Sequence, residues 1–124
     1  MARKVDMDLT SAVLHEDTGA VSDALSRGGN PNARLAENGT PLHLAVITGN
    51  LGTVEQLIGA GAELEASDCR GWRPLHWAAI ASGNPKLIER LLDAGAEINA
   101  RDQKCSTPLD RASAMGTAAT AHSL

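Results

Sequence analysis

The sequence predicts an all-α repeat solenoid, in which pairs of short helices stack side by side. Three observations support this prediction. Pro-Leu-His occurs at residues 41–43 and 74–76, and Pro-Leu-Asp follows at 108–110, so the starts are 33 and 34 positions apart. Gly-Ala-Glu stands at 61–63 and 95–97. Between these landmarks, apolar residues recur three and four positions apart, as they do along one face of a helix.

The first helix of each repeat is expected to begin at one of three equivalent prolines, Pro41, Pro74 and Pro108. The first residue of a helix has no partner for its N–H, so a proline costs nothing there. Thr40 and Thr107 precede two of these prolines and are good N-cap residues. Arg73 precedes the remaining proline, Pro74, and we expect a weaker cap there.

The second helix of each repeat is expected to end at a glycine, which adopts the left-handed conformation that closes many helices. Gly61 and Gly95 occupy this place in the clearest repeats, and Gly28 does so near the start of the chain. Residues of the N-cap type stand before each second helix: Asp17, Asn50, Asn84 and Thr117. Helices of about ten residues are marginal alone, so stacking must bury their apolar faces.

These landmarks resemble the ankyrin repeat, a unit of about 33 residues with the signature Thr-Pro-Leu-His-x-Ala. The resemblance implies that each repeat consists of a β-turn finger followed by two antiparallel helices. Residues 40–45 read Thr-Pro-Leu-His-Leu-Ala, and residues 73–78 read Arg-Pro-Leu-His-Trp-Ala. The resemblance covers residues 1–124 as a single domain of four repeats, approximately 5–34, 35–67, 68–101 and 102–124. The first repeat is degenerate, with Met7 in the place of Thr40, and the last is truncated.

The resemblance implies structural roles for the signature histidines, His43 and His76, which in this family hydrogen-bond backbone between repeats. It implies the same for the prolines and glycines that bound the helices: Pro41, Pro74, Pro108, Gly61 and Gly95. The two histidines also stand at equivalent positions of their repeats, each beside a core leucine. A catalytic residue has no need to be repeated in this way. No positioned partner for a general base is evident beside either histidine.

Two departures from the repeat pattern carry structural expectations. The third repeat has one extra residue between Trp77 and Gly83, which is expected to lengthen the turn after its first helix. The turn position that holds Gly71 in the third repeat holds Asn38 in the second and Cys105 in the fourth. Cysteine adopts positive φ poorly, so we expect the last finger to be strained or rearranged.

Eight residues are predicted to contact a partner, because the resemblance places their positions in the fingers and on the concave groove: Arg70, Trp72, Trp77, Lys104, Arg111, Leu44, Ile47 and Ile80. Trp and Arg are enriched at interface hot spots. Arg70, Lys104 and Arg111 are expected to lie near both tryptophans, as a basic and aromatic patch that favours an acidic or apolar partner segment. The alternative is that Trp72 folds back as a lid and Trp77 covers the neighbouring repeat.

Composition weighs against several other functions. The net charge of −4 argues against nucleic acid, and no apolar run is long enough to span a membrane. Cys69 and Cys105 are too few for a disulfide scaffold or a zinc site, so we expect free thiols and a reducing cytoplasm. No catalytic, cofactor-binding or metal-binding motif is apparent, so neither an enzyme nor a bound cofactor is expected.

The sequence therefore predicts a protein-interaction module, a scaffold, adaptor or regulator that binds a partner protein of unspecified identity. It is expected to be a monomer or a weak homodimer. The alternative function is self-association through the fourth repeat, whose second helix would begin near Thr117 and lacks a charged outer face. Pairing there would bury Met115, Ala118 and Ala121.

Overall fold

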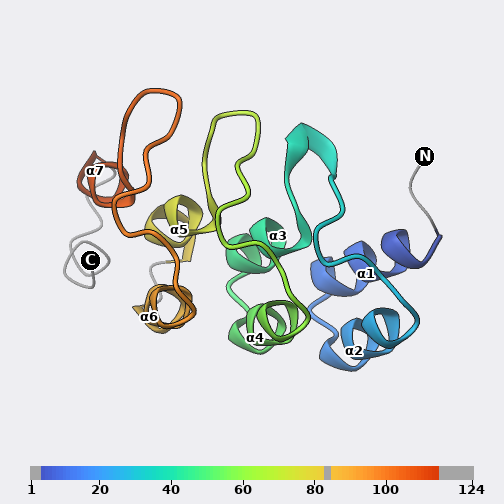
Figure 1. The fold of residues 1–124 in the computed structure, drawn as a ribbon. Helices are drawn as coiled ribbons and strands as arrows, with labels where there is room; N and C mark the ends of the chain where they lie inside the picture. Colours follow the sequence, from blue (N-terminus) through green and yellow to red (C-terminus); the bar gives the residue numbers. More distant parts are fainter. Residues whose placement is uncertain (1–3, 83–84, 115–124) are drawn as a thin grey trace.

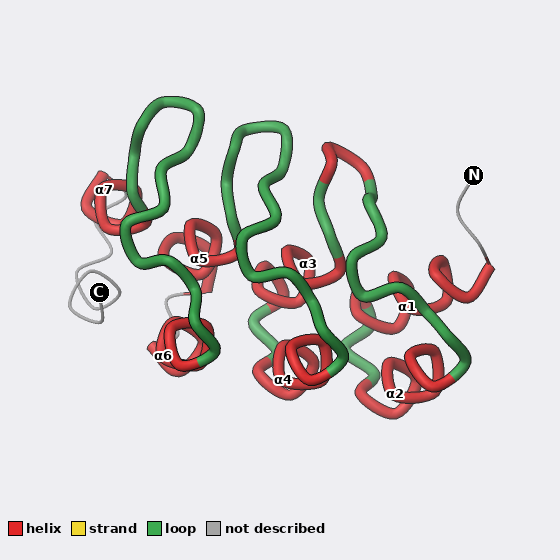
Figure 2. Tube along the Cα trace, viewed as in Figure 1, coloured by secondary structure: helices red, strands yellow, loops and turns green. Residues whose placement is uncertain are grey.

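A computed structural model of the protein describes residues 4–82 and 85–114. The inner row of helices comprises α1 (Lys4–Leu14), α3 (Pro41–Thr48), α5 (Pro74–Trp77) and α7 (Pro108–Ala114). The outer row comprises α2 (Thr18–Ser26), α4 (Leu51–Gly59) and α6 (Pro85–Asp93), as Figure 1 shows. The described residues contain no strand (Figure 2). The predicted all-α repeat solenoid is confirmed.

Three loops project from the same side of the inner row (Figures 1 and 2). We name them finger A (residues 35–39), finger B (residues 68–72) and finger C (residues 102–106). Finger A contains a short 3-10 turn, Ala36–Asn38. Each finger leads directly into an inner helix, so a side chain near a fingertip lies close to side chains on the exposed face of that helix.

The helices begin where the cap residues predict. Thr40 Oγ1 accepts a bond from the backbone N–H of His43, and Thr107 Oγ1 accepts one from Asp110. Arg73 caps α5 without a side-chain hydrogen bond, as its identity predicted. Asp17 and Asn50 cap α2 and α4 through their side-chain oxygens. The other two predicted caps, Asn84 and Thr117, lie outside the described residues.

The outer helices end at left-handed glycines, as the sequence predicted. The φ angles of Gly28, Gly61 and Gly95 are 93°, 94° and 107°. Beyond Gly61, the N–H of Ala62 donates to the carbonyl of Leu57 at 3.0 Å. Such a bond satisfies a carbonyl that the end of a helix would otherwise leave unpaired.

The core lies between the two rows of helices and runs from α1 to α6. Its largest fully buried side chains come from every helix pair: Leu9, Val13, Val21, Leu42, Val46, Val54, Leu57, Leu75, Leu87, Ile88 and Leu91. Burying one such aliphatic side chain contributes about 1.5–3 kcal/mol. The described core contains no Phe or Tyr, since the chain has neither. Small aliphatic layers thus hold the short helices together.

Two details differ from the sequence-based expectations. The extra residue of the third repeat does not simply lengthen a turn, because residues Ala78–Ser82 form a π-helical segment that continues α5. A π turn is the usual way in which a helix absorbs one inserted residue. Met7 lies within α1 rather than at a helix start, because that helix already begins at Lys4.

None of the helices in the described residues combines the length and the hydrophobicity that a membrane span requires.

Candidate binding surface

The three fingers share one hydrogen-bonded frame. The N–H of the first residue donates to the carbonyl of the fifth in each finger: Leu35 to Gly39 at 2.8 Å, Asp68 to Trp72 at 3.0 Å, and Asp102 to Ser106 at 3.0 Å. The fourth residue has positive φ in every finger: 59° at Asn38, 76° at Gly71 and 61° at Cys105. Finger C therefore keeps the common frame, with Cys105 held in a conformation that costs about 1–2 kcal/mol for a residue with a Cβ.

Fingers B and C are each organised by a buried carboxylate. Asp68 Oδ1 accepts bonds from the N–H groups of Arg70 at 2.9 Å and Trp72 at 3.1 Å. Asp102 Oδ1 accepts the equivalent bonds from Lys104 and Ser106, both at 2.9 Å. These are Asx-type contacts, in which a side chain satisfies the backbone of its own turn. They fix the conformation of both fingers.

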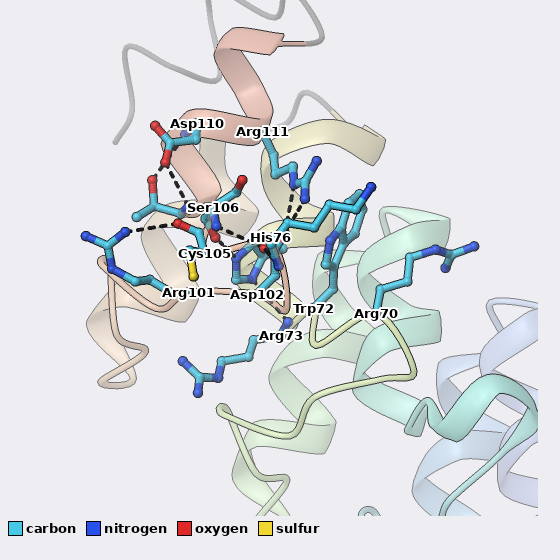
Figure 3. A network of polar contacts seen from close by, with 12 residues as sticks. Arg70, Trp72, Arg73, His76, Arg101, Asp102, Cys105, Ser106, Asp110 and Arg111 are labelled. Carbon is cyan, nitrogen blue, oxygen red and sulfur yellow. Dashed lines mark hydrogen bonds and ion pairs between the residues drawn. The ribbon is translucent and has the colours of Figure 1, made fainter.

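The second oxygen of each carboxylate holds a side chain from the following inner helix. Asp68 Oδ2 accepts a bond from the indole N–H of Trp77 at 2.8 Å. Asp102 Oδ2 accepts one from Arg111 Nε at 2.8 Å and lies 2.6 Å from its terminal nitrogen. Figure 3 shows Arg111 reaching down to Asp102 beside Trp72. Trp77 and Arg111 are thus both fixed by internal bonds.

Burial and ion pairing act in opposite directions on Asp102. Burial raises the pKa of this carboxyl. The N–H of Ser106, the Arg111 guanidinium and the N–H of Lys104 lower the pKa, and together they outweigh burial. The net result is a pKa below the ordinary value of 3.8. Asp102 is therefore ionised at neutral pH and holds Arg111 by a charge-assisted bond.

The signature histidines connect each inner helix to the next finger. His43 Nε2 lies 2.9 Å from the carbonyl oxygen of Trp72, and His76 Nε2 lies 3.0 Å from that of Ser106. The Nδ1 atoms accept bonds from the N–H groups of Thr40 and Arg73. Because Nδ1 accepts, the proton of each neutral ring is on Nε2, which donates to the finger. These bonds fix fingers B and C onto the helices beside them.

Burial lowers the pKa of both histidines below 6.5, and the hydrogen bonds to the finger carbonyls only partly offset this effect. Both rings are therefore neutral at pH 7. In the fourth repeat Asp110 occupies the histidine position, and its carboxylate accepts a bond from the N–H of Thr107 at 3.0 Å. That bond and the Thr107 hydroxyl lower the pKa of Asp110.

The predicted aromatic and basic residues gather between fingers B and C. The rings of Trp72 and Trp77 meet edge to face, with 4.6 Å between their centroids. The guanidinium of Arg111 lies 5.2 Å from the centroid of Trp72, and that of Arg70 lies 5.6 Å from the centroid of Trp77. Both distances are within the range of a cation–π contact. Both indoles are half-buried, and Trp77 also packs against the core.

Two of the three predicted apolar residues, Leu44 and Ile47, lie beside Trp77. Leu44, Ile47 and Trp77 line an open hollow of about 200 Å³ at the base of finger A. Ile47 is 43% exposed, which is high for an aliphatic side chain, whereas Leu44 is half-buried. Ile80 lies half-buried in the π-helical segment. The eight predicted contact residues therefore divide into a basic and aromatic group and an apolar group.

Asp68 and Asp102 are the residues of this surface that the sequence analysis did not include among the sites. Their position, nine residues before Trp77 and Arg111, was a usable signal, because both of those side chains donate hydrogen bonds. Repeat two has Leu35 and Leu44 at the same two positions, so both members of the pair are polar in two repeats and both are apolar in the other. Pairwise exchange of this kind indicates contact across the finger base.

The remaining candidate chemistry is limited in the part of the chain that the structure describes. Cys69 and Cys105 are free and exposed, as expected. Residues 4–82 and 85–114 hold no group of three or more metal-ligating side chains. Met115, Ala118 and Ala121, the residues predicted for self-association, lie outside the described residues. The arrangement is therefore that of a fixed surface of cations, indoles and aliphatic side chains.

A family model of three ankyrin repeats matches residues 9–102. This chain is a member of the ankyrin-repeat family. The chain is 46% identical over 77 residues to NF-kappa-B inhibitor alpha of Homo sapiens. That match covers 59% of this chain and 24% of the inhibitor.

Two further relatives differ widely in their names. Over 67 residues the chain is 42% identical to Potassium channel KOR1 of Oryza sativa subsp. japonica, covering 54% of this chain and 8% of the channel. Over 71 residues it is 37% identical to RelA-associated inhibitor of Mus musculus, covering 57% of this chain and 9% of that protein. The chain thus spans a small part of each relative.

Proposed function

We propose that this chain binds a partner protein through fingers B and C and the adjoining exposed face of the inner helices. The observation that carries the proposal is the cluster of Trp72, Trp77 and Arg111, in which Asp68 holds the Trp77 side chain and Asp102 holds the Arg111 side chain that lies over Trp72. Large aromatic and guanidinium groups of this kind dominate the binding energy of protein interfaces.

Pre-organisation is the physical advantage of this arrangement. Ordering a long side chain on binding costs about 0.5–1.5 kcal/mol. Arg111 and Trp77 have already lost that freedom on folding, because each is bonded to a buried carboxylate. A rigid solenoid of this kind binds without large rearrangement of its backbone.

The relatives agree with a binding role. Two of them are named as inhibitors, and the name of one of these specifies NF-kappa-B as its target. The chain covers less than a quarter of the length of each of these relatives, so the activity of a whole relative does not transfer to it. We carry over only the coarser property, that ankyrin repeats bind other proteins, and propose a regulator or adaptor rather than an enzyme.

The test is affinity capture with mass spectrometry on a matched set of variants. Ile47→Ser alters the proposed surface, whereas Ile98→Ser alters an exposed isoleucine between α6 and finger C. The two side chains are similarly exposed, at 43% and 36%, so the pair controls for lost apolar surface. We expect the parent chain and Ile98→Ser to retain the same partner, and Ile47→Ser and Trp72→Ala to lose it. Equal capture by all four proteins, each with an unchanged helical circular dichroism spectrum, would contradict the proposal.

A further inference from the structure

We propose that the groove between the tips of fingers B and C binds an acidic segment of the partner protein, with a carboxylate seated between Arg70 and Lys104. This inference rests on the proposed protein-binding function and specifies the chemistry of the partner. It concerns the fingertips, whereas Trp77 and the apolar hollow lie nearer to the helices.

The groove is an open cavity of about 370 Å³. It is lined by Cys69, Arg70, Trp72, Gln103, Lys104 and Arg111. Three of these six residues are cationic and none is acidic. An opening lined by one sign of charge attracts a ligand of the opposite sign.

The three cations differ in how far they are already neutralised. Arg111 is paired with the buried Asp102 and is 24% exposed, so Asp102 largely neutralises its charge. Arg70 lies 3.6 Å from Glu37, and both side chains are at least half exposed, so that pair is weak. Lys104 is exposed and forms no ion pair with any described residue. Lys104 is therefore available at the groove, and Arg70 becomes available when its guanidinium turns away from Glu37 and Trp77.

The contact between Glu37 and Arg70 shows how a carboxylate fits between neighbouring tips. Glu37, Arg70 and Lys104 occupy the same position in fingers A, B and C. Between the tips of fingers A and B the chain itself supplies the acid, since Glu37 lies 3.6 Å from Arg70. The groove between the tips of fingers B and C is lined by Lys104 and Arg70 and by no acid, and Arg70 can exchange its weak pair with Glu37 for an acid seated there. A glutamate or aspartate from the partner completes the same pattern there.

The fingertips are held in place before any ligand arrives. The N–H of Cys69 donates to the carbonyl of Glu37 at 2.9 Å, and the N–H of Gln103 donates to that of Arg70 at 3.3 Å. Gly71 lies so close to finger C that a Cβ would meet the Gln103 nitrogen at 2.7 Å. The spacing of the cations is thus set by backbone contacts.

The charge distribution of the chain favours the same partner. The finger segments 34–40, 67–73 and 101–107 carry five cationic side chains: Arg34, Arg70, Arg73, Arg101 and Lys104. Their three acids are Glu37, Asp68 and Asp102, and the last two are buried. The whole chain has a net charge of −4, so the fingers are basic on an otherwise acidic protein. Overall acidity disfavours nucleic acid, the other common polyanion.

The experiment is a nuclear magnetic resonance titration of the ¹⁵N-labelled full chain with a blocked tetraglutamate peptide and its tetraglutamine counterpart. We expect saturable shifts at the amides of Arg70, Gln103 and Lys104 with tetraglutamate, and none with tetraglutamine. Lys104→Gln and Arg70→Gln should each weaken binding about two- to five-fold, as loss of an exposed ion pair does. Lys4→Gln, which removes an exposed charge from α1, should leave binding unchanged.

Glu37→Gln gives the sharpest test, because it should strengthen binding. Removing this carboxylate frees Arg70 from its internal partner, so we expect about two-fold tighter binding of tetraglutamate. A substitution that only damaged the fold would weaken binding instead.

Several results would overturn the proposal: no saturable shift, equal binding of both peptides, or shifts spread over all cations including Lys4. Tighter binding of an oligothymidylate, with the same dependence on Lys104, would reassign the groove to nucleic acid. Failure here would leave the wider binding function intact if the Ile47 and Trp72 variants still lost a captured partner. Failure of that capture experiment, with tetraglutamate still bound, would instead reject only the wider surface.

Discussion

Finger A and fingers B and C share a backbone frame but differ in what stabilises their tips. Fingers B and C begin with Asp68 and Asp102, each of which accepts two backbone N–H bonds from its own turn. Finger A begins with Leu35, whose side chain has no acceptor, and only its backbone carbonyl accepts a bond from the turn, from the N–H of Asn38 at 3.0 Å. Its tip forms a 3-10 turn in which both Glu37 and Asn38 have positive φ, at 56° and 59°.

The difference extends to the adjoining helices. A buried carboxylate that accepts two N–H bonds from its own turn still has lone pairs without a donor. It therefore requires a further donor, which the next helix supplies. Trp77 is that donor for finger B and Arg111 for finger C, while finger A has Leu44 at the same position. One residue at the start of a finger thus determines whether the neighbouring groove is polar and fixed or apolar.

The largest effect is expected at the contact between fingers B and C. In Gly71→Ala, the new Cβ lies 2.7 Å from the backbone nitrogen of Gln103, and φ is +76°. Since a backbone atom rather than a flexible side chain must move, we expect a loss of about 2–4 kcal/mol in unfolding free energy. Urea denaturation followed by circular dichroism measures it. Asn38→Ala is the control at the matching position of finger A, and an equal loss there would refute the role of the B–C contact.

The two carboxylates should differ in what their removal costs. Asp102→Ala leaves the partly buried Arg111 charge without its partner, so we expect a loss of about 3 kcal/mol in unfolding free energy. Asp68→Ala leaves unpaired N–H groups but no charge, so we expect about 2 kcal/mol. Denaturant titrations of both variants measure the difference. Equal losses would indicate that the finger turns, rather than the Trp77 and Arg111 partners, account for the stabilisation.

The pH dependence separates repeats two and three from repeat four. Burial lowers the pKa of His43 and His76 in the folded chain, so the unfolded chain binds more protons as pH falls. Their contribution is complete above about pH 6.5 and is lost below it, because a protonated Nδ1 no longer accepts the helix-start N–H. Asp110 also has a lowered pKa, so its contribution is lost only as pH falls below about 3.8.

We therefore expect the urea midpoint to fall between pH 7 and pH 5 and again below pH 4. His76→Asn should reduce the first fall and leave the second unchanged. A midpoint that is constant from pH 7 to pH 5 would show that the two rings are not the groups that titrate.

The sequence was sufficient for the features that depend on local chemistry. Prolines, cap residues and glycines specify helix ends within a few bonds, so Pro41, Thr40 and Gly61 were interpreted correctly. The pairing of Asp68 with Trp77 was missed, because it joins a turn to a helix across the finger base. The π-helical segment was also missed, since whether an extra residue widens a helix or a turn depends on packing.

The smallest expected effect is a gain in stability at the tip of finger C. Cys105 has a φ of 61°, the conformation that Gly71 adopts in finger B without a Cβ. Cys105→Gly removes the steric cost but makes the unfolded chain more flexible, so the two effects partly cancel. We expect a net gain of about 0.5–1 kcal/mol in unfolding free energy by urea denaturation. Cys69→Gly, at a fingertip position without positive φ, is the matched control and should be neutral or destabilising. If both variants gained equally, loss of a thiol rather than relief of backbone strain would account for the effect.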